Sequence, residues 1–380
     1  MQIAQIKLGQ FDQLASQLDE LKAIEPQWLL VFGSRAFLAD TPLFSVLRQS
    51  FPSAVLLGCS TAGEISAGGV GEDGCVITAI HWRFGVPQCA LTQLQDMQDS
   101  EQAGQRLAEQ LQQPLSGVLL FAQGVNINGS ALVAGLERGL PAGVPIMGGL
   151  AGDGTAFNQT VVLSPAGVAA DAVVAMAIPA GVSVGHGSYG GWKPFGPARR
   201  VSRHEGNVLY ELDDEPALDV YKRYLGEYAG QLPSSGLLFP FEMLGQDHSA
   251  VGVVRTILGV DEASGSLTLA GDLLSDGYLR LMHASNDALA DGAESAALAA
   301  RALNGAVSGL GLLVSCVGRK LVMGGRVDEE IEAVAGVLGP QISLAGFYSY
   351  GEISPLLGAT GCKLHNQTMT ISILSDQPYE

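Results

Sequence analysis

The stretch GCSTAGEIS, at residues 58–66, returns near the far end of the chain as GFYSYGEIS, at residues 346–354. Each copy follows a short apolar run, and each combines small residues with a single glutamate. Small residues, glycine above all, let two backbone segments approach each other closely. The repeated turn therefore predicts a duplicated structural unit, and the sequence around each copy bears on that prediction.

Around these turns, the order helix, strand, helix, strand, glycine turn and return strand occurs three times. Short apolar runs typical of buried strands lie at 28–35, 117–124 and 310–319. Segments with helical spacing of apolar residues precede these runs at 11–24, 100–113 and 287–305. Return strands are expected after the turns at 75–80, 158–163 and 365–374, of which the last two share the letters Asn-Gln-Thr. The matching order indicates a repeated αβ scaffold.

The fold class follows from this order. We expect an α/β protein with two related mixed-sheet αβ halves, whose internal pseudo-repeats pack around a central cleft. The pattern changes between the second and third units, where Gly- and Pro-rich strands are followed by a helix at 216–226. We therefore expect an N-terminal domain at 1–190 and a C-terminal domain at 191–380.

Composition excludes several classes of function. The 380 residues are 47% hydrophobic and 15% charged, which is typical of a folded globular protein, and the net charge of −18 disfavours nucleic acid and anionic membranes as partners. The first twenty residues lack the pattern of a signal peptide, and the longest apolar stretch contains Pro179 and is too short for a membrane helix. Five cysteines without CxxC spacing indicate reduced thiols in a cytoplasmic protein.

The glycine turns are the first candidate binding site. Their backbone N–H groups could hold an anionic ligand that comes close to the chain. The alternative is that the glycines only permit tight turns and that each glutamate braces its own turn. The candidate ligand-binding residues are Gly58, Ser60, Thr61, Gly63, Glu64, Ser349, Gly351 and Glu352.

Arg35 and Arg319 form a second candidate group, because each follows a predicted buried strand. Loops at the carboxyl ends of strands form the ligand crevice of α/β sheets, and an arginine there could bind a carboxylate. A structural salt bridge is the alternative. Neither Cys59 nor Ser60 lies in a nucleophile motif, and a carboxylate pair needs a tuned separation, so we do not expect an enzyme.

The longest motifs resemble those of the FIST family, which has an N-terminal and a C-terminal FIST domain. The resemblance rests on LLGCSTAGEIS, on the segment from GGWKPFGP to EPALDVY, and on LAGFYSYGEISP with HNQTMTISIL, and it covers nearly the whole chain. It implies a sensory protein for intracellular signal transduction that binds a small ligand.

The motifs GGWKPFGP and YLGEYAGQLP are similar to those of stand-alone family members that bind haem and sense nitric oxide, the NosP type. This resemblance implies haem b, nitric oxide as ligand, and a histidine kinase or cyclic-di-GMP signalling protein as partner. Because one axial imidazole is enough to hold haem iron, His283 or His186 is the expected ligand. The remaining candidate haem contacts are Arg35, Arg319, Tyr189 and Trp192. A haem-free sensor of a small metabolite, such as an amino acid, is the alternative; the oligomeric state stays open, a homo-oligomer included.

Overall fold

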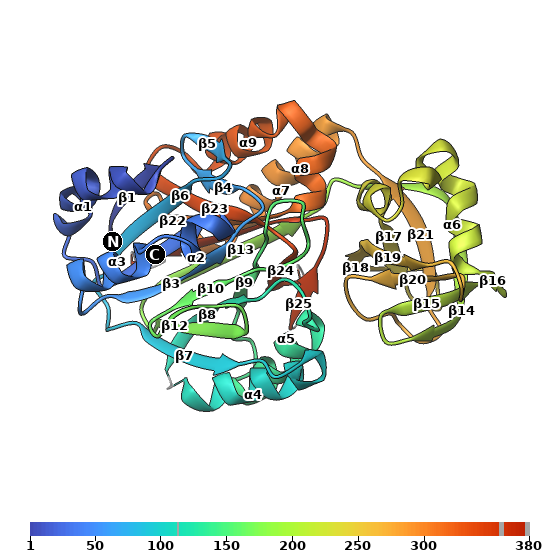
Figure 1. Ribbon diagram of the computed structural model, residues 1–380, viewed down its shortest axis with the longest axis horizontal. Helices are drawn as coiled ribbons and strands as arrows, with labels where there is room; N and C mark the ends of the chain where they lie inside the picture. The colour runs from blue at the N-terminus through green and yellow to red at the C-terminus, as the bar shows by residue number, and fades with distance from the viewer. Residues whose placement is uncertain (112–113, 357–360, 377–380) are drawn as a thin grey trace.

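The computed structural model describes residues 1–111, 114–356 and 361–376. The chain forms a large α/β body and a smaller appended domain, which lies at the right of Figure 1 and comprises residues 193–283. The body is built from three units of similar element order. The mixed α/β fold class is therefore confirmed, and so is the threefold repetition expected from the sequence.

Each unit of the body runs strand, helix, strand, helix, strand, short hairpin and return strand. The first unit comprises β1 (Gln2–Leu8), α1 (Leu14–Lys22), β2 (Trp28–Gly33), α2 (Arg35–Ala39), α3 (Leu43–Ser50), β3 (Val55–Ser60), β4 (Glu64–Ser66), β5 (Gly69–Gly71) and β6 (Cys75–His81). The second comprises β7 (Gln88–Gln93), α4 (Ser100–Gln110), β8 (Leu115–Ala122), α5 (Gly129–Gly139), β9 (Ile146–Leu150), β10 (Val162–Ser164), β11 (Gly167–Ala169) and β12 (Ala172–Pro179). The third comprises β13 (Ser183–Tyr189), α7 (Asn286–Asn304), β22 (Gly309–Cys316), α8 (Val317–Met323), α9 (Asp328–Leu338), β23 (Ile342–Ser349), β24 (Gly351–Pro355), β25 (Cys362–His365) and β26 (Met369–Ser375).

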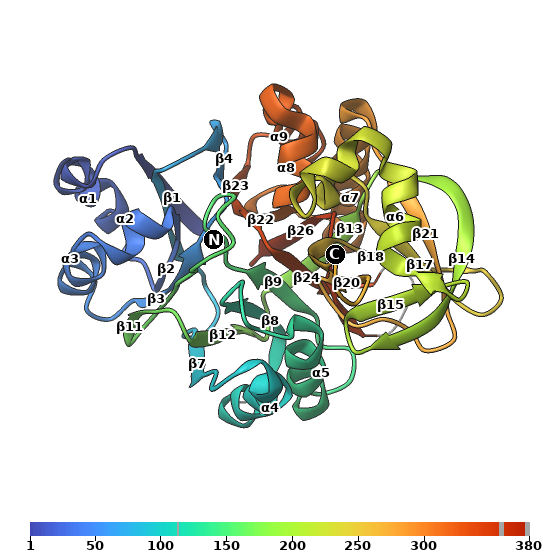
Figure 2. The ribbon, with the colours of Figure 1, turned by 45° about the vertical axis from the view of Figure 1, so that its right-hand side comes forward.

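The hairpin of each unit joins the sheet of another unit. Sheet 1 has the strand order β1-β6-β2-β3-β10-β11, sheet 2 the order β25-β24-β9-β8-β12-β7, and sheet 3 the order β13-β26-β22-β23-β4-β5. The first unit thus extends sheet 3, the second extends sheet 1, and the third extends sheet 2. Figure 2 shows one such exchange, in which β4 of the first unit lies beside β23 of the third.

One predicted return strand is wrong. The segment 158–163 leads into β10, which pairs with β3 of sheet 1 as part of the exchanged hairpin. The return strand of the second unit is β12, which pairs antiparallel with β8. The shared Asn-Gln-Thr letters mislead because the second unit carries a longer loop, at 151–161, between its turn and its hairpin.

Aromatic side chains fill the space between the sheets. Phe32 and Phe347 lie 4.6 Å apart between ring centroids, and Phe121 packs edge-on against Phe32 at 5.5 Å. All three side chains are fully buried. The centre of the body is therefore a packed core where we expected a central cleft.

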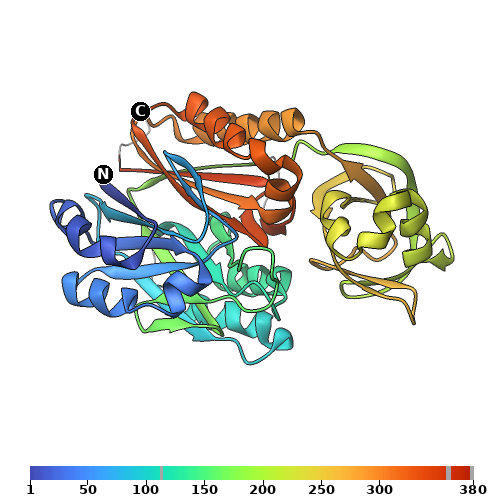
Figure 3. The same cartoon turned by 45° about the horizontal axis from the view of Figure 1, so that its top comes forward.

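The appended domain interrupts the third unit between β13 and α7. It contains β14 (Lys193–Glu205), β15 (Val208–Leu212), β16 (Glu215–Pro216), α6 (Ala217–Leu225), the short 3-10 helix η4 (Ser234–Leu238), β17 (Phe241–Leu244), β18 (Ala250–Arg255), β19 (Ile257–Asp261), β20 (Ser266–Leu269) and β21 (Tyr278–His283). Its strands form one sheet around its own apolar core. Figure 3 shows it as a separate mass beside the body. The predicted division at residue 190 falls where the chain leaves β13 for this domain.

Candidate functional site

The glycine turns of the three units meet one another. Gly152 N–H donates to Ser60 O at 2.8 Å, Ala62 N–H donates to Tyr348 O at 2.8 Å, and Tyr350 N–H donates to Leu150 O at 3.2 Å. The turns thus close a ring of backbone hydrogen bonds through all three units. This contact answers why the chain repeats the turn: each copy supplies one side of the junction.

Close backbone approach explains the shared glycine of each copy. A Cβ on Gly58 would lie 1.8 Å from Val31 O, and a Cβ on Gly346 would lie 1.9 Å from Leu313 O. Gly148 has the same position in the second unit, with a distance of 2.1 Å to Leu120 O. A side chain cannot fit at such distances, so these glycines have a structural reason for being there.

The two glutamates brace their own turns, as the structural interpretation predicted. Thr61 Oγ donates to Glu64 Oε1 at 2.7 Å, and Ser349 Oγ donates to Glu352 Oε1 at 2.9 Å. Both glutamates are at most 2% exposed, and burial raises the pKa of each carboxyl from 4.5 to about 7. Of the predicted ligand-binding residues, Ser60, Thr61, Glu64, Ser349 and Glu352 therefore lie buried in the junction, together with Gly63 and Gly351.

The two arginines lie in different environments. Arg319 is fully buried; its guanidinium pairs with Glu330 at 2.7 Å and also donates to Leu289 O and Gly190 O. These partners give Arg319 a structural role at this position. Arg35 is about one-third exposed and contacts Asp40, at the end of its own helix, and Gln159, in the loop 151–161.

The candidate haem contacts are spread over the molecule. His283 is exposed at the end of β21 in the appended domain, where its ring meets Phe195 edge-on at 5.9 Å. Tyr189 is 44% exposed, and Trp192 Nε1–H donates to Gln367 O at 2.7 Å. His186, on β13, lines a cavity between sheets.

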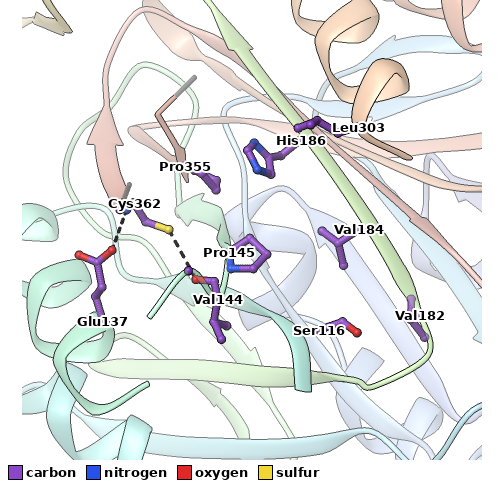
Figure 4. Close-up of a pocket in the computed structure, with 12 residues that line it drawn as sticks. Ser116, Glu137, Val144, Pro145, Val182, Val184, His186, Leu303, Pro355 and Cys362 are labelled. Carbon is purple, nitrogen blue, oxygen red and sulfur yellow. Dashed lines mark hydrogen bonds between the residues drawn. The ribbon is translucent and has the colours of Figure 1, made fainter. Parts of the chain in front are cut away.

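This cavity has a volume of about 500 Å³ and lies between sheets 2 and 3 (Figure 4). Such a volume lies within the range of small-molecule sites. One wall is β13, and the opposite side comes from the start of β8, the α5–β9 loop and the β24–β25 hairpin. Its apolar lining includes Val144, Pro145, Val182, Val184, Leu303 and Pro355.

Alternation along β13 directs these side chains. Val182, Val184 and His186 lie on the face toward the cavity. Gly185 and Gly187 lie on the other face, where a Cβ on either would come within 2.3 Å of a carbonyl oxygen of α7. Glycine on one face therefore lets α7 pack tightly against β13, while the other face stays free to line the cavity.

The polar groups of the cavity are few. His186 Nδ1 is buried without a hydrogen-bond partner among the described residues, and burial lowers the pKa of this imidazole, so it is neutral at pH 7. Glu137 Oε1 accepts from Cys362 N–H at 2.9 Å, and burial raises the pKa of the Cys362 thiol to about 11. Sequence reasoning missed Glu137 and Cys362, which only the fold brings beside β13.

The described ranges contain no group of three or more metal-ligating His, Cys, Asp or Glu side chains. Within them, none of the helices combines the length and the apolar character required to cross a membrane. The arrangement can hold a small molecule through one neutral imidazole, one carboxylate, the Ser116 hydroxyl and apolar walls.

Comparison with known proteins gives distant relatives. The uncharacterized protein Rv0628c of Mycobacterium tuberculosis is 26% identical over 375 residues, which is 94% of each chain. The uncharacterized protein MJ1623 of Methanocaldococcus jannaschii is 28% identical over 49% of this chain and 38% of its own. A solved structure of a cyanuric acid hydrolase from A. caulinodans aligns over 97% of this chain and 98% of its own, but the similarity is weak, with 9% identity and a TM-score of 0.33.

Family models match most of the chain. The FIST N domain matches residues 27–215, and the FIST C domain matches residues 217–355. Both glycine turns fall within these two matches, whereas the motif HNQTMTISIL, at residues 365–374, lies beyond the second match. The chain belongs to the FIST family.

Proposed function

We propose that this protein is a cytoplasmic, non-enzymatic sensor that binds haem b in the cavity between sheets 2 and 3 and responds to nitric oxide. FIST domains are generally sensor domains of signal-transduction proteins. A partner histidine kinase or cyclic-di-GMP signalling protein would read the response. The haem, nitric-oxide and partner assignments rest on the resemblance to the NosP type together with the cavity.

The observation that carries the proposal is the state of His186. Its imidazole lines the cavity, it is kept neutral by burial, and its Nδ1 has no partner among the described residues. A neutral imidazole is the form that ligates iron. When bound, haem would supply an iron atom whose coordination responds to nitric oxide.

The cavity lining fits haem in two respects. His186 provides the iron ligand, and valine, leucine and proline side chains provide apolar walls for the porphyrin. The described lining contains no lysine or arginine, so haem propionates would depend on water for solvation. His283 is the weaker candidate ligand because it is exposed on the appended domain.

A second candidate function has its own observation. The charged group of the described lining is the Glu137 carboxylate, which would attract the ammonium group of a small metabolite such as an amino acid. In that version the protein would sense the metabolite without haem.

An absorption spectrum separates the two versions. We expect protein from haem-supplied cells to show a Soret band at about one haem per chain, which nitric oxide shifts. His186→Ala should abolish the band, while the matched variant His283→Ala should keep it. A wild-type protein without a Soret band would refute the haem version, and thermal-shift screening with amino acids and amines would then test the other.

A further inference from the structure

The β24–β25 hairpin touches both the cavity and the appended domain. Pro355 and Cys362, at the ends of its two strands, line the cavity. Leu356, the next residue after β24, packs against the core of the appended domain. Leu364 O, on β25, accepts a hydrogen bond from Arg255 Nη1 of that domain at 3.1 Å. A change in the position of this hairpin would therefore alter both the cavity wall and the contact with the appended domain.

Arg255 is an unusual group to place at such an interface. It is 6% exposed, and its guanidinium donates to the backbone carbonyls of Leu364, Asp272 and Val254. None of the salt bridges between described residues includes Arg255, although the Asp272 carboxylate acts on it electrostatically. Burial lowers the pKa of Arg255 to about 10. A buried guanidinium without a carboxylate partner loses much of its hydration.

Separation of the appended domain from the body would restore the hydration of the Arg255 guanidinium. The appended domain is joined to the body only through residues 190–192 and 284–285 in the chain. Its other polar links to the body are few: Gln367 Nε2–H donates to Leu237 O at 2.8 Å, and Asn128 Nδ2–H lies 3.4 Å from the Asp272 carboxylate. Away from the body, the Arg255 guanidinium would regain water and stay beside Asp272 of its own domain. Docked and undocked arrangements are thus closer in free energy than a purely apolar contact would make them.

We propose that docking of the appended domain through Arg255 is coupled to the cavity, so that the β24–β25 hairpin transmits ligand occupancy to that domain. The proposal rests on the proposed function, because the cavity must be the ligand site. Coupling free energies are reciprocal, so a change at Arg255 must also alter the cavity when no ligand is present. The coupling can therefore be tested without knowing the ligand.

The reactivity of Cys362 reports the state of the cavity wall. Full-length wild type, Arg255→Met and the control Arg280→Met are treated with N-ethylmaleimide, and alkylation of each cysteine is followed by peptide mass spectrometry. Arg280 lies in the same domain and pairs with Glu242. We expect N-ethylmaleimide to alkylate Cys362 about fivefold faster or more in Arg255→Met than in wild type. The alkylation rate of Cys362 in the control should match that in wild type.

Cys316 is buried in the core and serves as the internal control, because its alkylation would report general unfolding. An equal rate at Cys362 in wild type and Arg255→Met would overturn the proposal, and so would a parallel rise at Cys316. If the Met variant does not fold, Arg255→Lys, which keeps the charge but loses the planar fork of donors, is measured in the same way. Titration with hemin is run separately: failure to bind hemin refutes the haem version of the proposed function, whereas the Cys362 result decides the coupling.

Discussion

The Glu352 carboxyl group offers a sharp test of how the turn junction is built. It is fully buried, it accepts hydrogen bonds from Ser349 Oγ, Thr368 N and Thr368 Oγ, and burial still raises its pKa from 4.5 to about 7. The difference between these two pKa values corresponds to about 3 kcal/mol of stability.

The sign of the effect follows from proton binding. Because the folded state holds the proton of Glu352 more tightly than the unfolded state, folding carries no penalty from this group below pH 4.5. The penalty grows between pH 4.5 and 7 and reaches its full size above pH 7. Stability should therefore fall as pH rises through this window.

Glu352→Gln removes the titration. The glutamine carbonyl can accept from Thr368, and its amide can donate to Ser349 Oγ, since a hydroxyl can also accept. We expect the free energy of unfolding of the variant, relative to wild type, to rise by about 2–3 kcal/mol between pH 5 and pH 8. Urea unfolding followed by tryptophan fluorescence at several pH values measures this difference.

The comparison uses the change with pH, so any constant cost of the substitution cancels. Glu332→Gln, on the exposed side of α9, is the matched control and should follow wild type at every pH. Parallel profiles for wild type and Glu352→Gln would refute the reasoning, because they would mean that this carboxyl ionises in the folded protein as easily as in water.

Two further substitutions test the packing of the body. Gly346→Ala would put a Cβ 1.9 Å from Leu313 O, so we expect the free energy of unfolding to fall by at least about 3 kcal/mol, or no soluble protein. Gly336→Ala, which has open space around it, is the control, and both variants are measured by thermal unfolding. Arg319→Met leaves Glu330 buried without its cation and should cost about 3–5 kcal/mol, part of which a second change, Glu330→Gln, should restore in urea unfolding.

Much of the fold could be predicted from sequence because the repeats carry local signals. The helix expected at 216–226 is α6, which ends before Gly226, and the expected buried runs overlap β2, β8 and β22. These elements are specified by the spacing of apolar residues and by Pro and Gly at helix ends. Both signals lie within the segment itself and can be recognised without its tertiary contacts.

The exchange of hairpins could not be predicted in the same way. Which sheet a three-residue strand such as β10 joins depends on contacts between segments a hundred residues apart, and the local pattern is the same in either sheet. The misassigned return strand at 158–163 is the direct result of this limit.

The candidate site was predicted only in part for a related reason. The sequence marks His186 as a candidate iron ligand because it is a histidine in a glycine-rich segment. The structure places it in the cavity wall. Glu137 and Cys362 come from other elements and carry no local motif. The alternation of glycines with Val184 and His186 was the available signal, since it indicates a strand with one tightly covered face.

The hairpin exchange has a consequence for how the body assembles. Sheet 3 is finished by β4 and β5 from the opening unit, while sheet 2 is finished by β24 and β25 from the closing one. A fragment ending near residue 190 would keep β4 and β5 but have no host for them, and its own sheet 2 would lack two strands. Sheet 1 needs no strand beyond β11, whereas sheets 2 and 3 both need strands from the last part of the chain. Two of the three sheets of the body can therefore close only after these last strands are present, which places the assembly of these two sheets late in folding.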